Sequence, residues 1–137
     1  MARYLLDTNI ASCIIKGNSP AVDRRLVKVA MAELAISAVT EGELRFGAAR
    51  LPHATRLHSI IEDFFLHIAV LPWDSDAAQQ YGQLRAALER EGQSMGNLDT
   101  MIGAHALAMG AILVTNDRAF GRIKKLKVED WTKGSRP

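Results

Sequence analysis

Four acidic residues lie far apart in the sequence, and each lies close to where a short apolar run meets an amphipathic segment. They are Asp7, Glu43, Asp99 and Asp117. Ligand sets made only of oxygen select hard divalent ions such as Mg²⁺ or Mn²⁺ over zinc or copper. An ion held by such ligands lowers the pKa of a bound water and stabilises charge on a phosphoryl group. The four acids therefore predict attack of water on a phosphodiester bond.

Each of these acids also has an ordinary structural interpretation. Asp7 could cap a helix, and Thr40 to Glu43 has the spacing of a capping box. Asp99 could favour a helix dipole, and Asp117 could be a turn residue. Bringing the four together is unfavourable without a cation, because two like charges ~4 Å apart repel by about 4 kcal/mol at an effective dielectric near 20.

The elements that must position these acids alternate along the chain. Short apolar runs predict strands at residues 3–6, 34–37, 68–71 and 111–115, with a short fifth strand at 127–129. Amphipathic segments predict helices at 10–16, from Ser19-Pro20, at 40–50, from Pro52, at 75–91 and at 97–109. This alternation predicts an α/β fold with a mostly parallel central sheet of four or five strands flanked by helices.

In a parallel sheet the carboxyl ends of the strands share one edge, where ligands bind. Asp7 and Asp117 follow predicted strands. Glu43 is expected in the first turn of the helix from Thr40, and Asp99 in the first turn of a helix capped by Asn97. The four carboxylates are therefore expected at one edge. Glu41 is the alternative to Glu43 for this position. Residues two positions apart on a helix point in directions that differ by roughly 200°, so only one of the two can face the site.

Length and composition limit the remaining possibilities. The chain has 137 residues, which predicts a single domain over residues 1–137. Its one cysteine, Cys13, excludes an internal disulfide and favours a reducing compartment. No apolar run is long enough to span a membrane, and an acid at position 7 argues against a signal peptide. We therefore expect a cytoplasmic protein without a membrane partner.

The net charge of +2 is unevenly distributed. Residues 118–137 hold 7 Lys+Arg and 2 Asp+Glu, whereas residues 1–117 hold 10 and 13. A basic end beside an acidic body is compatible with a polyanionic partner such as RNA. A solvated charged terminus is an equally good interpretation of the charge alone.

The other polar residues show no pattern of a metal site or of a catalytic nucleophile. The four histidines show no paired metal-ligand spacing, and His105 is expected near the core with a hydrogen-bond partner. Ser12 and Ser37 have no neighbouring His-and-acid pattern that would make a nucleophile. Cys13 and Trp131 are typical of packing residues.

Four segments of the sequence resemble the PIN-domain ribonucleases, and among them the VapC toxins of type II toxin–antitoxin systems. They are residues 4–9, 36–47, 96–106 and 113–120, and each contains one of the four acids. The second segment favours Glu43 over Glu41. Ser94-Met95 replaces the Pro-Ile that the family often has before its third acid, and the family's fourth acid varies.

The resemblance implies several properties. They are Mg²⁺ dependence, homodimers, cleavage of structured RNA and inhibition by a cognate antitoxin protein. Some similar toxins cut the initiator tRNA in its anticodon region, and Glu129-Asp130-Trp131 agrees with that group. The apolar residues 10–15, with Leu44 and Phe46, predict a groove for an antitoxin segment.

Three rival functions share an acidic site. A response-regulator receiver would need a second acid beside Asp7 and an acid directly after the third strand, where Pro72 stands. A haloacid-type phosphatase needs Asp-x-Asp, and Asn9 occupies the second place. A PIN domain that cuts DNA has the same acids and differs only in its substrate.

Overall fold

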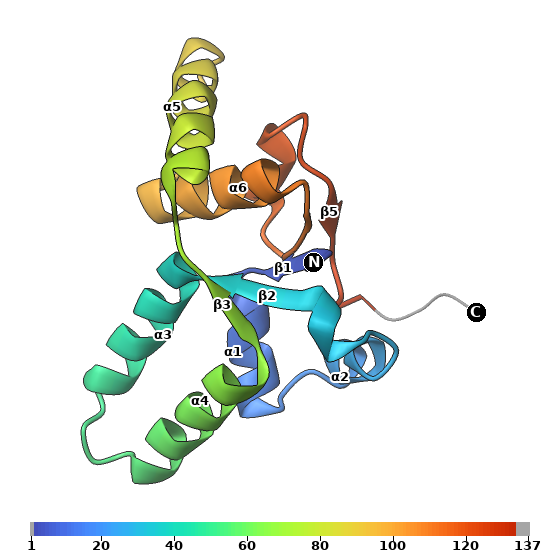
Figure 1. Ribbon diagram of the computed structural model, residues 1–137, viewed down its shortest axis with the longest axis vertical. Helices are drawn as coiled ribbons and strands as arrows, with labels where there is room; N and C mark the ends of the chain where they lie inside the picture. The colour runs from blue at the N-terminus through green and yellow to red at the C-terminus, as the bar shows by residue number, and fades with distance from the viewer. Residues whose placement is uncertain (1, 134–137) are drawn as a thin grey trace.

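The computed structural model describes residues 2–133 and has a five-stranded, fully parallel sheet at its centre (Figure 1). The strands are β1 (Tyr4–Leu6), β2 (Leu34–Ser37), β3 (Ala69–Leu71), β4 (Ile112–Val114) and β5 (Val128–Glu129). Their spatial order is β3-β2-β1-β4-β5, and all four neighbouring pairs are parallel. The predicted α/β class and parallel sheet are confirmed, and the short fifth strand is present.

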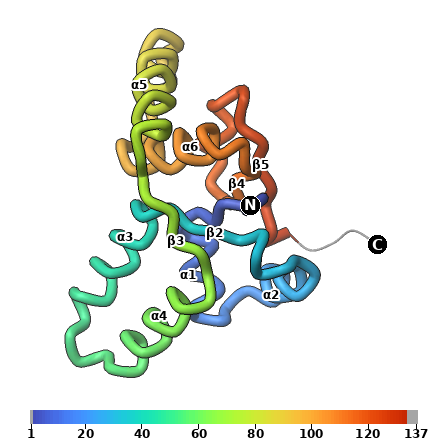
Figure 2. Tube along the Cα trace, viewed as in Figure 1, coloured from blue at the N-terminus to red at the C-terminus, as the bar shows by residue number. Residues whose placement is uncertain are grey.

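Among the described residues 2–133, six α-helices and two short 3₁₀ helices surround the sheet. They are α1 (Thr8–Lys16), α2 (Pro20–Leu26), α3 (Ala38–Ala49), α4 (Thr55–His67), α5 (Ser75–Arg90) and α6 (Asn97–Met109), with η1 (Met31–Glu33) and η2 (Arg118–Arg122). As the backbone trace shows, α3 and α4 extend from one side of the sheet and α5 and α6 from the other (Figure 2). Within residues 2–133, no helix is long and apolar enough to cross a membrane.

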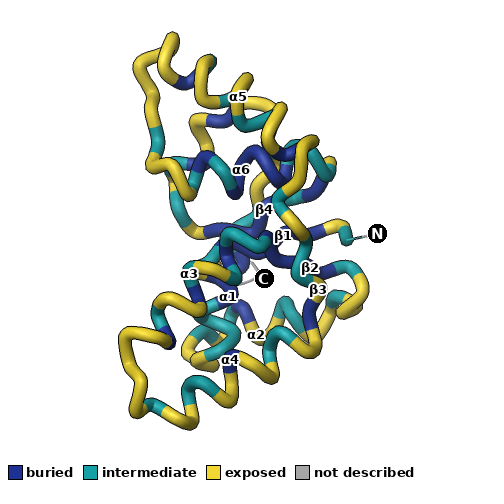
Figure 3. The backbone as a smooth tube through the Cα atoms, turned by 60° about the vertical axis from the view of Figure 1, so that its left-hand side comes forward, coloured by how far each residue is buried: buried dark blue, intermediate teal, exposed yellow. Residues whose placement is uncertain are grey.

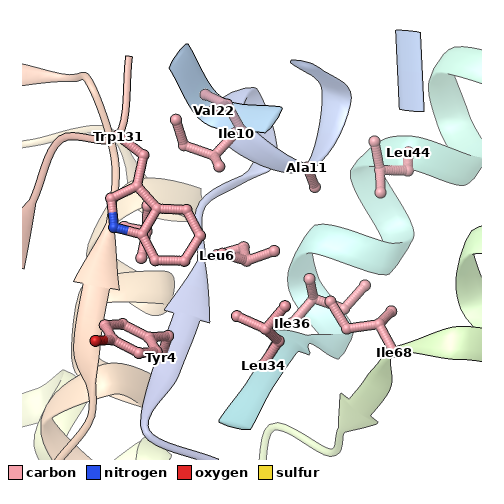
Figure 4. Close-up of a cluster of buried hydrophobic side chains, with 11 residues drawn as sticks. Tyr4, Leu6, Ile10, Ala11, Val22, Leu34, Ile36, Leu44, Ile68 and Trp131 are labelled. Atoms are coloured by element: carbon pink, nitrogen blue, oxygen red, sulfur yellow. The ribbon is translucent and has the colours of Figure 1, made fainter. Parts of the chain in front are cut away.

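The sheet separates two hydrophobic cores. On one side, Leu6, Ile10, Leu34 and Ile36 pack with Trp131 (Figure 4). On the other, Ile102 of α6, Phe120 of η2 and Ile123 directly after η2 pack against Leu5 and Leu113. Burial is concentrated where helices meet the sheet, and the outer parts of the two helical extensions are exposed (Figure 3). The central strand β1 is packed on both of its faces, so the residue that follows it, Asp7, is held in a fixed position.

Glycine and hydroxyl residues set several helix ends as the sequence predicts. Gly17 and Gly110 adopt left-handed backbone after α1 and α6, with φ of 61° and 64°. The Ser19 hydroxyl accepts from the Val22 N–H at the start of α2, with Pro20 in the first turn. A residue with φ near +60° there carries little strain only when it is glycine.

Three predicted helix starts were wrong. α1 begins at Thr8 rather than Ile10, because Asp7 accepts the Thr8 N–H directly after β1. α3 begins at Ala38 rather than Thr40, because the Ser37 hydroxyl caps the Val39 N–H directly after β2. The capping-box interpretation of Thr40 and Glu43 is therefore wrong, and Glu43 lies in the second turn. The helix expected from Pro52 begins at Thr55, since the Leu51 and His53 carbonyls accept turn hydrogen bonds from the Ala54 and Thr55 N–H groups.

Other differences between the predicted and the observed helices are smaller and concern helix caps, helix ends and the width of the buried stripe. Gly96, not Asn97, is the N-cap of α6, and α2 ends at Leu26, before the expected stripe residues Val29 and Ala30. Ile60 of α4 and Ala78 of α5 are exposed although they were expected to face inward. Both helices belong to the pairs that extend away from the sheet, α3 with α4 and α5 with α6. Each therefore buries a narrower apolar stripe than a helix that lies flat on the sheet.

Candidate active site

Asp7 lies at the centre of the candidate site, at the carboxyl end of β1. It is 4% exposed, and it caps α1 by accepting the Thr8 N–H at 2.7 Å. Its second oxygen accepts the Thr115 hydroxyl, also at 2.7 Å. Burial raises the pKa of Asp7 although these two hydrogen bonds lower it, and the charges of Glu43 and Asp117 raise it further. The capping role and a site role therefore coexist in one residue.

Asp99 faces the same region from the first turn of α6. Burial, and then the charges of the other three acids, raise the pKa of Asp99 to about 6; those acids are Asp7, Asp117 and Glu43. The four carboxylates predicted from the sequence are thus close enough to act on one another electrostatically. The shared edge expected from strand and helix ends is where the structure puts them.

Glu43 joins this group through a chain of hydroxyls. The Thr8 hydroxyl donates to Glu43 Oε1 at 2.6 Å, and it lies 3.1 Å from the Thr40 hydroxyl. A hydroxyl has one proton, so Thr40 is the donor to Thr8 in that pair. Glu41 instead forms an ion pair with Arg45 at 2.8 Å. Of the two candidates, Glu43 is the one directed toward Asp7.

Asp117 is positioned by a tight turn after β4. Its N–H donates to the Thr115 hydroxyl at 3.0 Å, and its Oδ1 accepts the Ala119 N–H at 2.9 Å, which caps η2. The turn role expected for Asp117 is therefore present. Because Thr115 also donates to Asp7, one hydroxyl links the two acids that follow neighbouring strands.

Threonines are the residues that the sequence reasoning missed. Thr8, Thr40 and Thr115 each contact an acid of the site, or a residue that does, and Thr40 and Thr115 are buried. The available signal was a hydroxyl residue within two positions of an acid at a predicted strand end, as in Asp7-Thr8 and Thr115-Asn116-Asp117. Buried carboxylates need donors, and short hydroxyl side chains supply them without adding positive charge.

His105 lies behind the site, as a core residue with a polar partner. Its Nδ1 lies 2.8 Å from the Ser37 hydroxyl, it is 3% exposed, and burial lowers its pKa. The expectation of a structural histidine with a hydrogen-bond partner is confirmed. Ser37 therefore caps α3 and also joins that helix to α6.

The donor set can be tested for its fit to a cation. Its oxygens are carboxylates and hydroxyls, and the pKa values of Asp7 and Asp99 are raised first by burial and then by the negative charges of the neighbouring acids. Within residues 2–133, no three Asp, Glu, His or Cys side chains stand close enough together to hold a metal ion as they are. The chemistry and the charge fit a hard divalent ion, and binding one would require the side chains to move closer together.

Comparison with known proteins places this arrangement in a family. The profile described as PIN domain matches residues 4–126. The chain belongs to the PIN domain family. Its similarity to the tRNA(fMet)-specific endonuclease VapC of Shigella flexneri is 41% identity over 133 residues, which covers 96% of this chain and all of that protein.

Solved structures support the same placement within the PIN family. The DNA-bound VapBC complex of Salmonella typhimurium matches with a TM-score of 0.89 and 36% identity, covering 96% of this chain and 99% of that one. VapBC2 of Rickettsia felis, bound to a promoter DNA fragment, matches with a TM-score of 0.84 and 31% identity, covering 92% and 96%. The chain is therefore of the VapC group of PIN domains, as the motifs predicted.

Proposed function

We propose that this protein is a metal-dependent endoribonuclease that acts as the toxin of a toxin–antitoxin pair. The observation that carries the proposal is the meeting of four carboxylates at one sheet edge, with the pKa of Asp99 raised to about 6. The described part of the site offers acids and threonines, and a cluster of carboxylates repels a phosphate unless a divalent cation lies between them. The similarity to VapC ribonucleases supports the same chemistry.

Asp7, Glu43, Asp99 and Asp117 are the residues that would hold Mg²⁺, with Mn²⁺ as a substitute. When bound, the ion supplies an activated water and stabilises charge on the scissile phosphate. The protein's own contribution is positioning. Thr115 and the Thr8 N–H fix Asp7, and the Thr8 hydroxyl fixes Glu43. Within residues 2–133, no hydrogen bond fixes the Asp99 carboxylate in this way, so it can adjust to a ligand.

The substrate we propose is a structured RNA, the initiator tRNA cut in its anticodon region. The support is the name of the Shigella flexneri relative, which specifies tRNA(fMet). The test incubates the purified chain with initiator tRNA, an elongator tRNA and a single-stranded DNA of equal length, and maps the new ends. Preferential cutting of initiator tRNA, lost in Asp99→Asn, is expected. Cutting of DNA at an equal rate would favour the DNA-nuclease alternative.

The partner we propose is a cognate antitoxin that docks on α3 and α4 near the site. Leu44 is buried there, as a core residue, but Phe46 remains 63% exposed, with the Arg50 guanidinium 5.0 Å from its ring. The structural neighbours are complexes of VapC with VapB, which supports a protein partner. Of the apolar residues predicted to line a groove, Ile10 and Ala11 are fully buried in the core, and Ile14 and Ile15 are partly buried against it. Phe46 is the most exposed of the set and therefore the best placed to contact a partner.

The docking site can be tested by titrating antitoxin against RNA cleavage. Phe46→Asp should weaken inhibition while cleavage remains measurable, because the substitution puts a charge into an apolar contact. Met31→Asp is the matched control, since Met31 is 52% exposed in η1. Equal inhibition of both variants would place the antitoxin elsewhere. A homodimer and a cytoplasmic location stay predictions of the sequence.

A further inference from the structure

A second charged feature lies between α2 and the segment that follows β5. These two parts of the chain enclose a cavity of about 400 Å³. Four of the residues that line it are basic, namely Arg24, Arg25, Lys28 and Lys133, and one is acidic, Asp130. We call this the α2 cleft. The last described residues pass close to α2, as the ribbon and the trace both show (Figures 1 and 2).

One wall of the α2 cleft is fixed to the sheet. Arg25 donates to Glu129 Oε1 at 3.0 Å, and its guanidinium lies 5.2 Å from the centre of the Trp131 ring. The Trp131 indole N–H donates to the same Glu129 oxygen, and its ring packs edge-on against Tyr4 of β1. Trp131 is 2% exposed, so it is a packing residue and offers no face on which a base could stack.

The other basic groups of the α2 cleft are exposed and uncompensated. Within residues 2–133, Arg24, Lys28 and Lys133 take part in no ion pair. Asp130 is occupied locally, because its Oδ1 accepts both the N–H and the hydroxyl of Thr132. In the basic stretch after Asp117, two groups are already engaged, because Lys124 lies 4.0 Å from Glu91 and Arg122 donates to the Ser94 carbonyl.

The α2 cleft begins beside the acidic edge. The Thr115 N–H donates to the Glu129 carbonyl at 3.0 Å, and the segment that lines the α2 cleft starts at the next residue, Asp130. Thr115 itself holds Asp7. A chain of phosphates that leaves the acidic edge along β5 therefore meets the α2 cleft.

The acids create the need for such a surface. Four carboxylates at one edge repel a polyanion, so binding of RNA there must be supplied by cations elsewhere on the molecule. We propose that the α2 cleft binds the phosphate backbone of the RNA substrate next to the part that is cut. This proposal rests on the proposed function. The described lining of the α2 cleft supplies basic side chains and no exposed aromatic face, so we expect its contacts to be to phosphates, which carry no sequence information directly.

Binding without cleavage tests the proposal directly. In the Asp99→Asn background, fluorescence anisotropy would measure the affinity for a tRNA and for an unrelated RNA hairpin at several salt concentrations. Each phosphate contact contributes roughly 0.7–0.9 to the slope of log K against log salt. Arg24→Gln with Lys28→Gln should therefore reduce the slope by about 1.5 for both RNAs. Lys133→Gln alone should reduce it by about half as much.

The matched control is Arg56→Gln with Arg90→Gln, which removes the same charge from exposed positions on α4 and α5. Slopes that fall equally in the α2 double variant and in this control would overturn the proposal, because the effect would then be net charge. Unchanged RNA binding with weakened antitoxin binding would overturn it as well, since the α2 cleft would serve the protein partner. If RNA binds with the expected slopes but the wild-type chain cuts none, the proposed function fails and the α2 cleft stands.

Discussion

The β1 side and the α6 side of the candidate site hold their central acids in different ways. Asp7, at the end of β1, is 4% exposed, and both of its oxygens accept hydrogen bonds of 2.7 Å. Asp99, in the first turn of α6, is partly exposed, and no donor within residues 2–133 reaches its carboxylate. One acid is fixed by the fold, and the other is positioned only by its helix.

The difference indicates where a ligand would act. Hydrogen bonds offset part of the cost of burying the Asp7 carboxylate, so Asp7 keeps its position at the centre of the sheet without a ligand. Nothing offsets the burial of Asp99 or the charges of its three neighbours, and its pKa rises to about 6. A bound cation would therefore stabilise the ionised form most at Asp99. We regard the β1 side as the scaffold of the site and the α6 side as its responsive part.

Removing divalent cations should have the largest effect. We expect RNA cleavage to fall to background in chelator, and to return with Mg²⁺ or Mn²⁺ but not with Ca²⁺, whose coordination is longer and looser. The comparison predicts a second signal, which is that Mg²⁺ should lower the pKa of the Asp99 carboxyl from about 6. Carbon-detected NMR titration of the side chain would measure this. Undiminished cleavage in chelator would point to a metal-free nuclease.

Substitution of either acid should remove cleavage but should affect folding unequally. Asp7→Asn and Asp99→Asn should each reduce the cleavage rate by more than about a hundredfold, the loss expected when several kcal/mol of metal-based stabilisation disappear. Asp7→Asn should be the less stable of the two, because an amide offers one acceptor oxygen where Asp7 uses two. Urea unfolding without metal checks this. Equal midpoints would remove the distinction between the two sides.

The Thr115 hydroxyl offers a way to weaken the scaffold alone. Thr115→Val removes a buried donor to Asp7 and an acceptor for the Asp117 N–H, and hydrogen bonds to charged groups contribute about 1.5–3 kcal/mol. We expect a loss of that size in the free energy of unfolding, together with a lower cleavage rate. Thr115→Ser is the control, since it keeps the hydroxyl. A valine variant as stable as wild type would show that Asp7 needs no such support.

The sequence predicted the parts of this arrangement that depend on periodicity and on strand ends. The apolar runs located all five strands to within a residue or two, and parallel order followed from their alternation with helices. Those two facts were enough to place Asp7 and Asp117 at one edge. The role of all four acids as metal ligands is still a prediction.

Local hydrogen bonding decided the features that the sequence reasoning missed. Ser37 both ends β2 and caps α3, so the strand passes into the helix without a loop, which apolar patterning could not show. The contacts of Thr8 with Thr40 and Glu43 join α1 to α3 across more than 30 positions. Such contacts depend on the packing of elements and not on spacing along the chain, so no window of sequence predicts them.

The smallest expected effect is a pH dependence of stability that belongs to the α6 side alone. In the unfolded chain Asp99 ionises near its ordinary pKa of 3.8, and in the folded chain near 6. Between these values the folded state binds more protons than the unfolded state, so this group lowers stability as pH rises from about 4 to about 6 and adds no further change above that. Asp99→Asn removes the titrating group. The stability of wild type relative to this variant, measured by urea unfolding in chelator, should therefore decline across that window and then level off. Asp76→Asn, which removes an exposed acid from the first turn of α5, is the matched control. The same pH dependence of unfolding free energy in both variants would contradict the raised pKa of Asp99. It would also contradict the inference that a cation acts mainly on the α6 side.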